Sequence, residues 1–182
     1  MKPRFPKRRA FSAQFFGLLD ELTARIDRVE KLLIERAETN EQVRLVRSHT
    51  GVGLLSGLAV VHTLGDVSRF ASSKQAVAFV GLDPLERSSA GKVRTGAISK
   101  AGSPLLRELL GHAMHAAVRF DGELKAFYKR LASRRSKSIA KVAATRKLLI
   151  RLFIMLRNGI DYNEFKGRGS TVGMPAQSHG LK

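Results

Sequence analysis

The chain contains no cysteine, which excludes both a disulfide framework and a thiolate-bound metal site. The absence fits a protein of the reducing cytoplasm, which is the location that we predict. Long hydrophobic runs are missing as well. The longest one, residues 51–61, falls well short of the roughly 18 residues that a membrane-spanning helix needs. We therefore expect no membrane partner, and the short apolar patch before Asp20 and Glu21 makes a poor secretory signal.

Acidic residues are scarce, with 15 Asp and Glu against 33 Lys and Arg, which gives a net charge of +18. Between Glu123 and Asp161 there is no acidic residue at all. A charge of this size favours a polyanionic partner, because neutralising phosphates releases their counterions. Hydrophobic residues make up 43% of the 182 residues, so one domain with a core and an appendage is expected. Nucleic acid is therefore the partner class that we expect first.

The N-terminal part predicts a basic arm, residues 1–10, followed by a long acidic amphipathic helix over residues 11–47. The arm is expected to be disordered until an anion orders it, or to remain a solvated tail. The helix carries apolar residues at alternating steps of four and three, which is typical of a coiled-coil seam. This seam either pairs with a second copy, which would make a homo-oligomer, or packs on the chain's own body. Its residues are Phe15, Leu19, Leu22, Ile26, Val29 and Leu33.

Residues 48–162 are predicted to form a mainly α domain, and residues 163–182 a disordered tail. Gly51 and Gly53 stand immediately before an apolar helix, residues 54–62. Backbone N–H groups at a helix N-terminus can bind a phosphate. The turn resembles the hairpin of helix-hairpin-helix modules, which hold a DNA backbone without reading its sequence. The alternative is a plain turn between two helices.

A structured loop interrupts the helical pattern between Gly81 and Ser103. Residues 92–98 leave room for at most a short strand or hairpin arm. Ser88 and Ser89 supply adjacent hydroxyls, and loops held between rigid elements often carry binding and catalysis. The loop has few acids, so its cations suit the handling of phosphodiesters. These cations are Arg87, Lys92, Arg94, Lys100 and Arg107.

The helices after the loop predict a basic bundle. Ser103 and Asp121 are predicted N-caps, and Pro104 suits the first position of a helix. His112 and His115 share a helix face without a nearby third ligand, so we interpret them as packing histidines and predict no metal site. The density of basic residues favours a nucleic-acid backbone over a membrane surface or a solvated face. The candidates for phosphate contact here are Arg134, Arg135, Lys137, Lys141, Arg146 and Lys147.

Residues 81–110 read GLDPLERSSAGKVRTGAISKAGSPLLRELL. Further segments read HTGVG at residues 49–53, LGDVSRF at residues 64–70 and ATRKLL at residues 144–149. Taken in their order along the chain, these segments resemble the C-terminal domain of transposases of the insertion-sequence 110/116/902 family. The family pattern in the central segment is Gly-Leu-x-Pro, four residues, Ser-Gly, a basic stretch with glycine, Ile-Ser/Thr-Lys-x-Gly and Leu-Arg. The resemblance covers roughly residues 45–162.

This resemblance implies a nucleophilic serine. By its spacing from Pro84, the family's serine falls on Ser89, with Ser88 as the second choice. It would attack a DNA phosphodiester and hold the broken strand as a phosphoserine link. Ala90 replaces the glycine that usually follows this serine.

The resemblance also implies partners. Family members carry an upstream nuclease-like domain with metal-binding carboxylates, so we interpret the chain as the serine-bearing half of a truncated or split transposase. Alone it is expected to bind no cofactor, and magnesium is expected only with a separate nuclease-like half. DNA is the implied substrate, and a guide RNA stays open as a further partner. The alternative is a non-catalytic basic DNA- or RNA-binding helical module left from a transposase.

Overall fold

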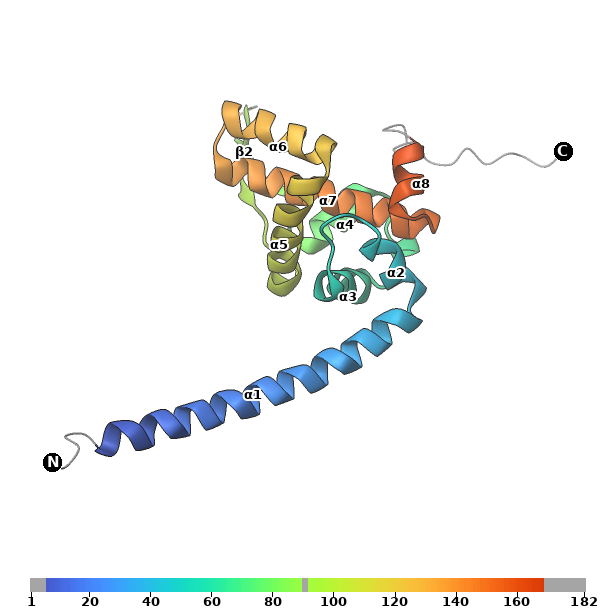
Figure 1. Cartoon of the computed structure of the whole chain (residues 1–182). Helices are drawn as coiled ribbons and strands as arrows, with labels where there is room; N and C mark the ends of the chain where they lie inside the picture. Colours follow the sequence, from blue (N-terminus) through green and yellow to red (C-terminus); the bar gives the residue numbers. More distant parts are fainter. Residues whose placement is uncertain (1–5, 90–91, 169–182) are drawn as a thin grey trace. The chain divides into compact units, whose positions relative to one another are not determined.

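The computed structural model describes residues 6–89 and 92–168, and for residues 6–11, 13, 86–89 and 92–96 it describes the backbone alone. Within these residues the chain forms eight α-helices, one 3₁₀ helix and one two-stranded sheet (Figure 1). The predicted mainly α fold is confirmed. The chain divides after Thr39 into two compact units.

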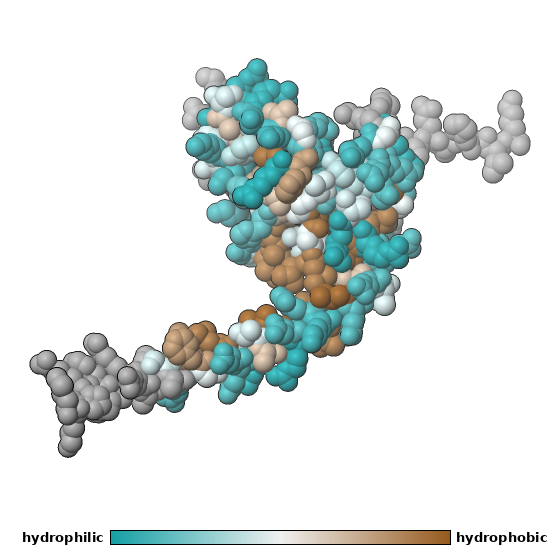
Figure 2. Space-filling model, viewed as in Figure 1, coloured by the Kyte–Doolittle hydropathy of each residue, from teal (hydrophilic) through white to brown (hydrophobic). Residues whose placement is uncertain are grey.

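The N-terminal unit is one helix, α1 (Pro6–Thr39). Proline suits its first position, because the N–H that proline lacks would have no partner there. Part of the predicted basic arm is therefore helical, and residues 1–5 lie outside the described residues. The seam side chains from Phe15 to Val29 are exposed over 42% to 56% of their surface, and Leu33 is half-buried. Figure 2 shows apolar residues at the surface of this helix.

The predicted helix over residues 11–47 is divided in two, because Asn40 interrupts it. The Asn40 backbone is extended, with φ −100° and ψ 107°. Its side-chain oxygen accepts a hydrogen bond from the Val43 N–H at 3.1 Å. An asparagine in this conformation is an N-cap, so it begins α2 (Glu41–Arg47) and does not continue α1.

The second unit is a helical bundle built around one long helix with a buried apolar face. After α2 the chain forms, in order, α3 (Leu54–Leu64), the 3₁₀ helix η1 (Val67–Arg69), α4 (Ser73–Val80), α5 (Pro104–Phe120), α6 (Gly122–Arg134) and α7 (Lys137–Asn158). Helix α7 packs against α2, α4, α5, α6 and η1, while α3 packs against α2 and α5. Leu148, Leu149, Leu152 and Phe153 of α7 are at most 2% exposed, so this helix supplies the centre of the core.

The helix ends in this unit follow local sequence signals. Ser103 Oγ accepts a hydrogen bond from the Leu106 N–H at 3.2 Å, and Pro104 is the first residue of α5. Gly81 and Gly159 end α4 and α7 with φ of +76° and +62°. Glycine adopts this left-handed conformation without a clash of Cβ. The predicted helix start at Ser103 and Pro104 and the predicted end of the helical pattern at Gly81 are confirmed.

Between α4 and α5 the chain forms an antiparallel hairpin of β1 (Pro84–Ser89) and β2 (Lys92–Ile98). The sequence predicts at most a short arm within residues 92–98. For residues 84–89 the sequence predicts a loop, since this segment has no β-branched or aromatic residue and no apolar alternation. The structure nevertheless pairs both segments, with an irregularity between Pro84 and Glu86.

After α7 the chain continues into a short helix, α8 (Tyr162–Gly167), which enters the predicted tail. Residues 169–182 of that tail lie outside the described residues. In the ranges that the structure describes, no helix combines the length and the apolarity that crossing a membrane requires.

Candidate nucleic-acid interface

The β1–β2 hairpin carries the serine pair. In its register Ser89 is the partner of Lys92, and Ser88 is the partner of Val93. Residues 90–91, which join the strands, lie outside the described residues. The two adjacent serines therefore differ in their cross-strand neighbours, because only Ser89 is opposite a cationic residue.

Two further cations of the predicted set, Arg87 and Arg94, are partners in the same register. Residues two apart in a strand belong to the same face of a sheet, as do direct cross-strand partners. Ser89, Arg87, Lys92 and Arg94 are therefore on one face of the hairpin. Ser88 belongs to the other face.

A second group of cations surrounds the turn between α6 and α7, and we call it the basic turn. The side chains of this group are exposed, and none forms an ion pair with a described residue. In Figure 2 the surface over this end of the bundle is hydrophilic. Arg146, farther along α7, is half-buried, while Lys100, after β2, is exposed. The basic turn consists of Lys129, Arg130, Arg134, Arg135, Lys137 and Lys141.

Two predicted phosphate contacts are engaged within the fold. Lys147 Nζ donates to Glu123 Oε1 at 2.6 Å. Arg107 Nη1 donates to the carbonyl oxygens of Val80, at 3.0 Å, and Gly102, at 2.7 Å. A phosphate would have to compete with these partners, whereas the cations of the basic turn have no such competitor among the described residues.

The two glycines of the predicted DNA-binding turn have different surroundings. At Gly51, φ is +91° and a Cβ would lie 2.3 Å from Ala117 N, so the turn packs directly on the α5 backbone. At Gly53, the N-cap of α3, a Cβ would meet nothing within 4 Å. Gly51 thus has a packing role in the fold, while the backbone at Gly53 has space for a ligand.

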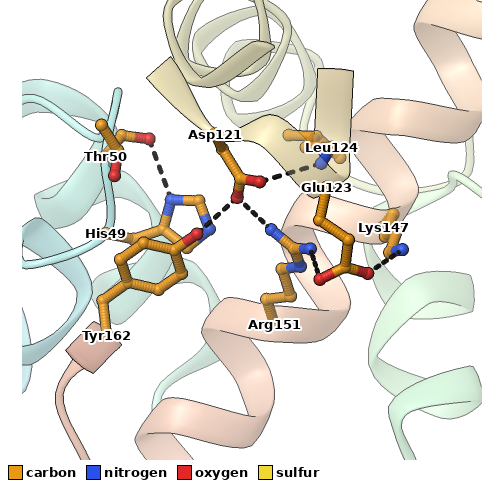
Figure 3. A network of polar contacts seen from close by, with 8 residues as sticks. All are labelled: His49, Thr50, Asp121, Glu123, Leu124, Lys147, Arg151 and Tyr162. Atoms are coloured by element: carbon orange, nitrogen blue, oxygen red, sulfur yellow. Dashed lines mark hydrogen bonds and ion pairs between the residues drawn. The ribbon is translucent and has the colours of Figure 1, made fainter. Parts of the chain in front are cut away.

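A buried polar cluster joins α6, α7 and α8 (Figure 3). Arg151 donates through Nη1 to Asp121 and through Nη2 to Glu123 Oε2, the latter at 2.7 Å. The Tyr162 hydroxyl also donates to Asp121. Asp121, Arg151 and Tyr162 are each at most 6% exposed, so they stabilise the fold and offer no surface to a polyanion.

The sequence indicates only one member of this cluster, Asp121, as a helix cap. That role is confirmed, since Asp121 Oδ1 accepts a hydrogen bond from the Leu124 N–H at 2.9 Å. A further signal was available in Arg151, which lies in register with the apolar face formed by Leu148 and Leu152. A charged residue on a buried helix face indicates a buried ion pair.

Burial and hydrogen bonding oppose each other at the Asp121 carboxyl. Burial alone would raise its pKa, but the bonds from the Leu124 N–H, the Tyr162 hydroxyl and the Arg151 guanidinium outweigh burial and lower the pKa. At Tyr162, burial and the bond to Asp121 both raise the pKa of the hydroxyl. Asp121 is therefore a carboxylate and Tyr162 a neutral donor.

His49 lies beside this cluster, with its ring centroid 4.1 Å from that of Tyr162. Its Nδ1 is 2.9 Å from the Thr50 carbonyl oxygen and must donate to it, so Nε2 carries the lone pair. Nε2 is buried without a hydrogen-bond partner among the described residues. Burial lowers the pKa of His49 to about 4, so the ring is neutral near pH 7.

Among the described residues, no three His, Cys, Asp or Glu side chains lie together as metal ligands. His112 Nε2 is 4.0 Å from Glu108 Oε1 on an exposed face of α5. The described residues therefore do not fit a magnesium site.

The profile of the Transposase IS116/IS110/IS902 family matches residues 43–129, which include the hairpin and the α2–α3 turn. A Pseudomonas aeruginosa protein named "Probable family 20 transposase" is 36% identical over 101 residues, covering 56% of this chain and 30% of the relative. A Coxiella burnetii protein named "Transposase for insertion sequence element IS1111A" is 37% identical over 115 residues, covering 61% of this chain and 32% of the relative. The chain thus matches about a third of the length of these curated relatives. Residues 43–129 are thus similar to a domain of the IS116/IS110/IS902 transposase family.

Proposed function

We propose that the chain binds DNA and takes part in DNA transposition with Ser89 as the nucleophile. The observation that carries this proposal is the hairpin register within the matched domain, in which Ser89 is opposite Lys92 and shares a face with Arg87 and Arg94. Cations around a serine favour attack on phosphorus, because they stabilise the negative charge of a pentacovalent phosphorane. Ser88, opposite Val93, is the less suitable nucleophile.

In the proposed step, the Ser89 hydroxyl oxygen attacks the phosphorus of a DNA phosphodiester. The bond between phosphorus and one strand end breaks, that end leaves as a free hydroxyl, and the other end stays attached as a phosphoserine. The serine proton passes to a general base, and the leaving oxygen takes up a proton. The described residues offer no carboxylate cluster for magnesium. We therefore assign the metal and the base to a nuclease-like domain outside the described residues.

DNA binding is assigned to the basic turn. Its exposed cations lack ion-pair partners among the described residues, so each is available to neutralise a phosphate. The backbone N–H groups beyond Gly53 at the start of α3 would add donors for another phosphate. Contacts of this kind hold a nucleic-acid backbone without reading bases.

A salt titration tests this assignment. The affinity for a fluorescent DNA duplex, measured by anisotropy, should fall by roughly 10³ to 10⁵ between about 50 and 200 mM salt if six to ten phosphates are contacted. The double change Arg134→Glu and Lys141→Glu should weaken binding and lower the salt slope by about two. The matched control is Arg28→Glu with Lys31→Glu, which makes the same change in net charge on exposed positions of α1.

A salt-independent affinity would contradict binding through phosphates. Equal losses in the two double variants would mean that net charge governs binding and that the basic turn has no special role. DNA or RNA binding without a covalent product, even with a nuclease-like half present, would favour the alternative of a non-catalytic binding module.

A further inference from the structure

The chain segments that enter and leave the β1–β2 hairpin contact each other at its base, and we call this contact, residues 79–83 with residues 99–102, the hairpin neck. A Cβ on Gly102 would lie 2.2 Å from the Phe79 carbonyl oxygen and 2.7 Å from Val80 C. A Cβ on Gly81 would lie 2.5 Å from Ala101 N. Real side-chain atoms do not approach backbone so closely, so the two segments touch without space for any side chain at either glycine.

Hydrogen bonds hold the two segments of the neck together. Lys100 N–H donates to the Gly81 carbonyl at 3.1 Å, and Ser99 N–H donates to the Asp83 carbonyl at 2.9 Å. The Ser99 hydroxyl also donates to Asp83 Oδ1. Lys100 has a φ of +56°, an uncommon conformation for a residue with a side chain, which indicates that the surroundings impose it.

Arg107, in the first turn of α5, contacts both segments at once. Its Nη1 donates to the Val80 carbonyl, where α4 ends, and to the Gly102 carbonyl, where the chain returns from β2. The side chain is half-buried. The Arg107 guanidinium thus links both segments of the neck, the one before β1 and the one after β2, to helix α5.

We propose that Arg107 is a positioning residue that fixes the direction in which the serine-bearing hairpin leaves the helical bundle. The consequence for strand transfer rests on the proposed function of Ser89, whereas the mechanical role of Arg107 does not. This role replaces the phosphate contact that the sequence predicts for Arg107. Lysine is a poor substitute, because it lacks the rigid planar fork of the guanidinium.

Because Ser89 lies at the far end of β1, a small rotation of the hairpin at the neck displaces this residue by a larger distance. From Pro84 to Ser89 the strand rises about 17 Å, at roughly 3.4 Å per residue. A rotation of about 10° at the neck would therefore move the backbone of Ser89 by about 3 Å. Reactions between a nucleophile and a bound group are sensitive to displacements of about 1 Å. A loose neck would thus reduce the rate of phosphoserine formation while leaving the DNA-binding surface intact.

Hydrogen exchange of the full chain tests the proposal directly. In Arg107→Lys and in Gly102→Ala, the amides of Ser99 and Lys100 should exchange about tenfold faster or more, because the hydrogen bonds of the neck open locally. Helix α7 should keep its protection in both variants. The matched control is Gly111→Ala on α5, where a Cβ would meet nothing within 4 Å, so exchange at the neck should not change. Unchanged exchange in a folded Arg107→Lys variant would overturn the proposal, whatever the fate of Gly102→Ala.

DNA binding separates the two possible roles of Arg107. Arg107→Gln should keep the salt slope of the parent chain, whereas loss of a phosphate contact would lower the slope by about 0.9. In an assay of the covalent product with the nuclease-like half present, Arg107→Lys should slow product formation at saturating DNA by about tenfold while changing Kd by less than about threefold. A lowered slope, or a loss confined to Kd, would overturn the positioning role. Failure of the parent chain to bind DNA would contradict the proposed function, and the exchange result would still decide the role of Arg107.

Discussion

Arg151 carries a charge that is almost completely removed from water, with 3% of the residue exposed. Two carboxylates, on Asp121 and Glu123, compensate for the lost hydration, and the Tyr162 hydroxyl uses another lone pair of Asp121. Such a pair contributes little beyond a well-packed apolar replacement, but removal of one member leaves the other charge buried and unpaired. The cluster should therefore be sensitive to single substitutions.

Replacing Arg151 with methionine should lower the free energy of unfolding by about 3–5 kcal/mol, because the Asp121 carboxylate stays buried without its cation. Adding Asp121→Asn should cost less in the Arg151→Met background than in the parent chain, since the two residues are coupled. Urea unfolding measures both effects. Lys141→Met, at an exposed position, is the control and should change stability by less than about 0.5 kcal/mol. A loss below about 1 kcal/mol for Arg151→Met would contradict the assigned role.

His49 predicts a pH dependence of stability. In the unfolded chain its pKa should be near the ordinary value of about 6.5, while in the fold burial lowers it to about 4. The hydrogen bond to Thr50 opposes that shift, Arg151 adds to it, Asp121 opposes it and Lys166 adds to it. As the pH falls from about 6.5 to about 4, the unfolded state takes up a proton that the folded state rejects, so up to about 3 kcal/mol of stability is lost.

The comparison of the parent chain with His49→Phe isolates this effect. In thermal unfolding between about pH 4 and pH 7, the stability of the variant should fall less steeply with decreasing pH than that of the parent chain. The difference in slope should correspond to the uptake of about one proton fewer on unfolding. The lowered pKa of Asp121 acts at lower pH, because a carboxylate loses its stabilising contribution only as the pH falls below its unfolded pKa. Identical pH profiles for the parent and the variant would contradict a neutral, buried His49.

At the scale of elements, α1 is distinguished by an apolar seam that stays exposed. Its five residues from Phe15 to Val29 follow heptad spacing, and each is more than 40% exposed. Exposed apolar surface of this extent on one helix is typical of an interaction face. Heptad spacing favours a second copy of the same helix as the partner, because a and d residues interlock with their equivalents.

Light scattering tests self-association through this seam. The parent chain should have about twice the monomer mass of 20.0 kDa. Ile26→Asp, at the centre of the seam, should reduce it to the monomer mass, because a charge replaces a buried contact. Ala24→Asp, outside the seam on the same helix, is the matched control and should keep the dimer. A monomeric parent chain would exclude pairing of the seam between copies.

The elements that the sequence predicts correctly are those with local causes. The start of α5 at Ser103 and Pro104 and the end of α4 at Gly81 depend on neighbouring residues alone. The sequence does not predict the helix break at Asn40, because a single N-cap residue interrupts an otherwise continuous helical pattern. Strand β1 has no strand-forming pattern of its own and is stabilised by its pairing with β2, which no local signal predicts.

At the scale of the whole molecule, the predicted cations fall into groups that composition cannot separate. Those of the basic turn are exposed and without ion pairs among the described residues, while Lys147 and Arg107 have partners inside the fold. The hairpin cations Arg87, Lys92 and Arg94 are placed by the register of the two strands. The candidate site could thus be predicted as a region, because charge and motif are local. The division of its residues depends on contacts between α4, α5, α6 and α7, which are distant in sequence.

The central claim is that Ser89 becomes covalently joined to DNA. The most direct measurement uses the full chain with a nuclease-like half, magnesium and a DNA whose scissile phosphate carries a bridging sulfur, since the released thiolate reverses the attack poorly. The denatured product is digested and the DNA-linked peptide is sequenced by mass spectrometry. We predict a phosphodiester on Ser89 that is absent in Ser89→Ala and retained in Ser88→Ala. The DNA affinity of Ser89→Ala should differ from that of the parent chain by less than about threefold, since one neutral hydroxyl contributes little to binding. A DNA adduct on Ser88 or another residue, or full strand exchange by Ser89→Ala, would contradict the claim.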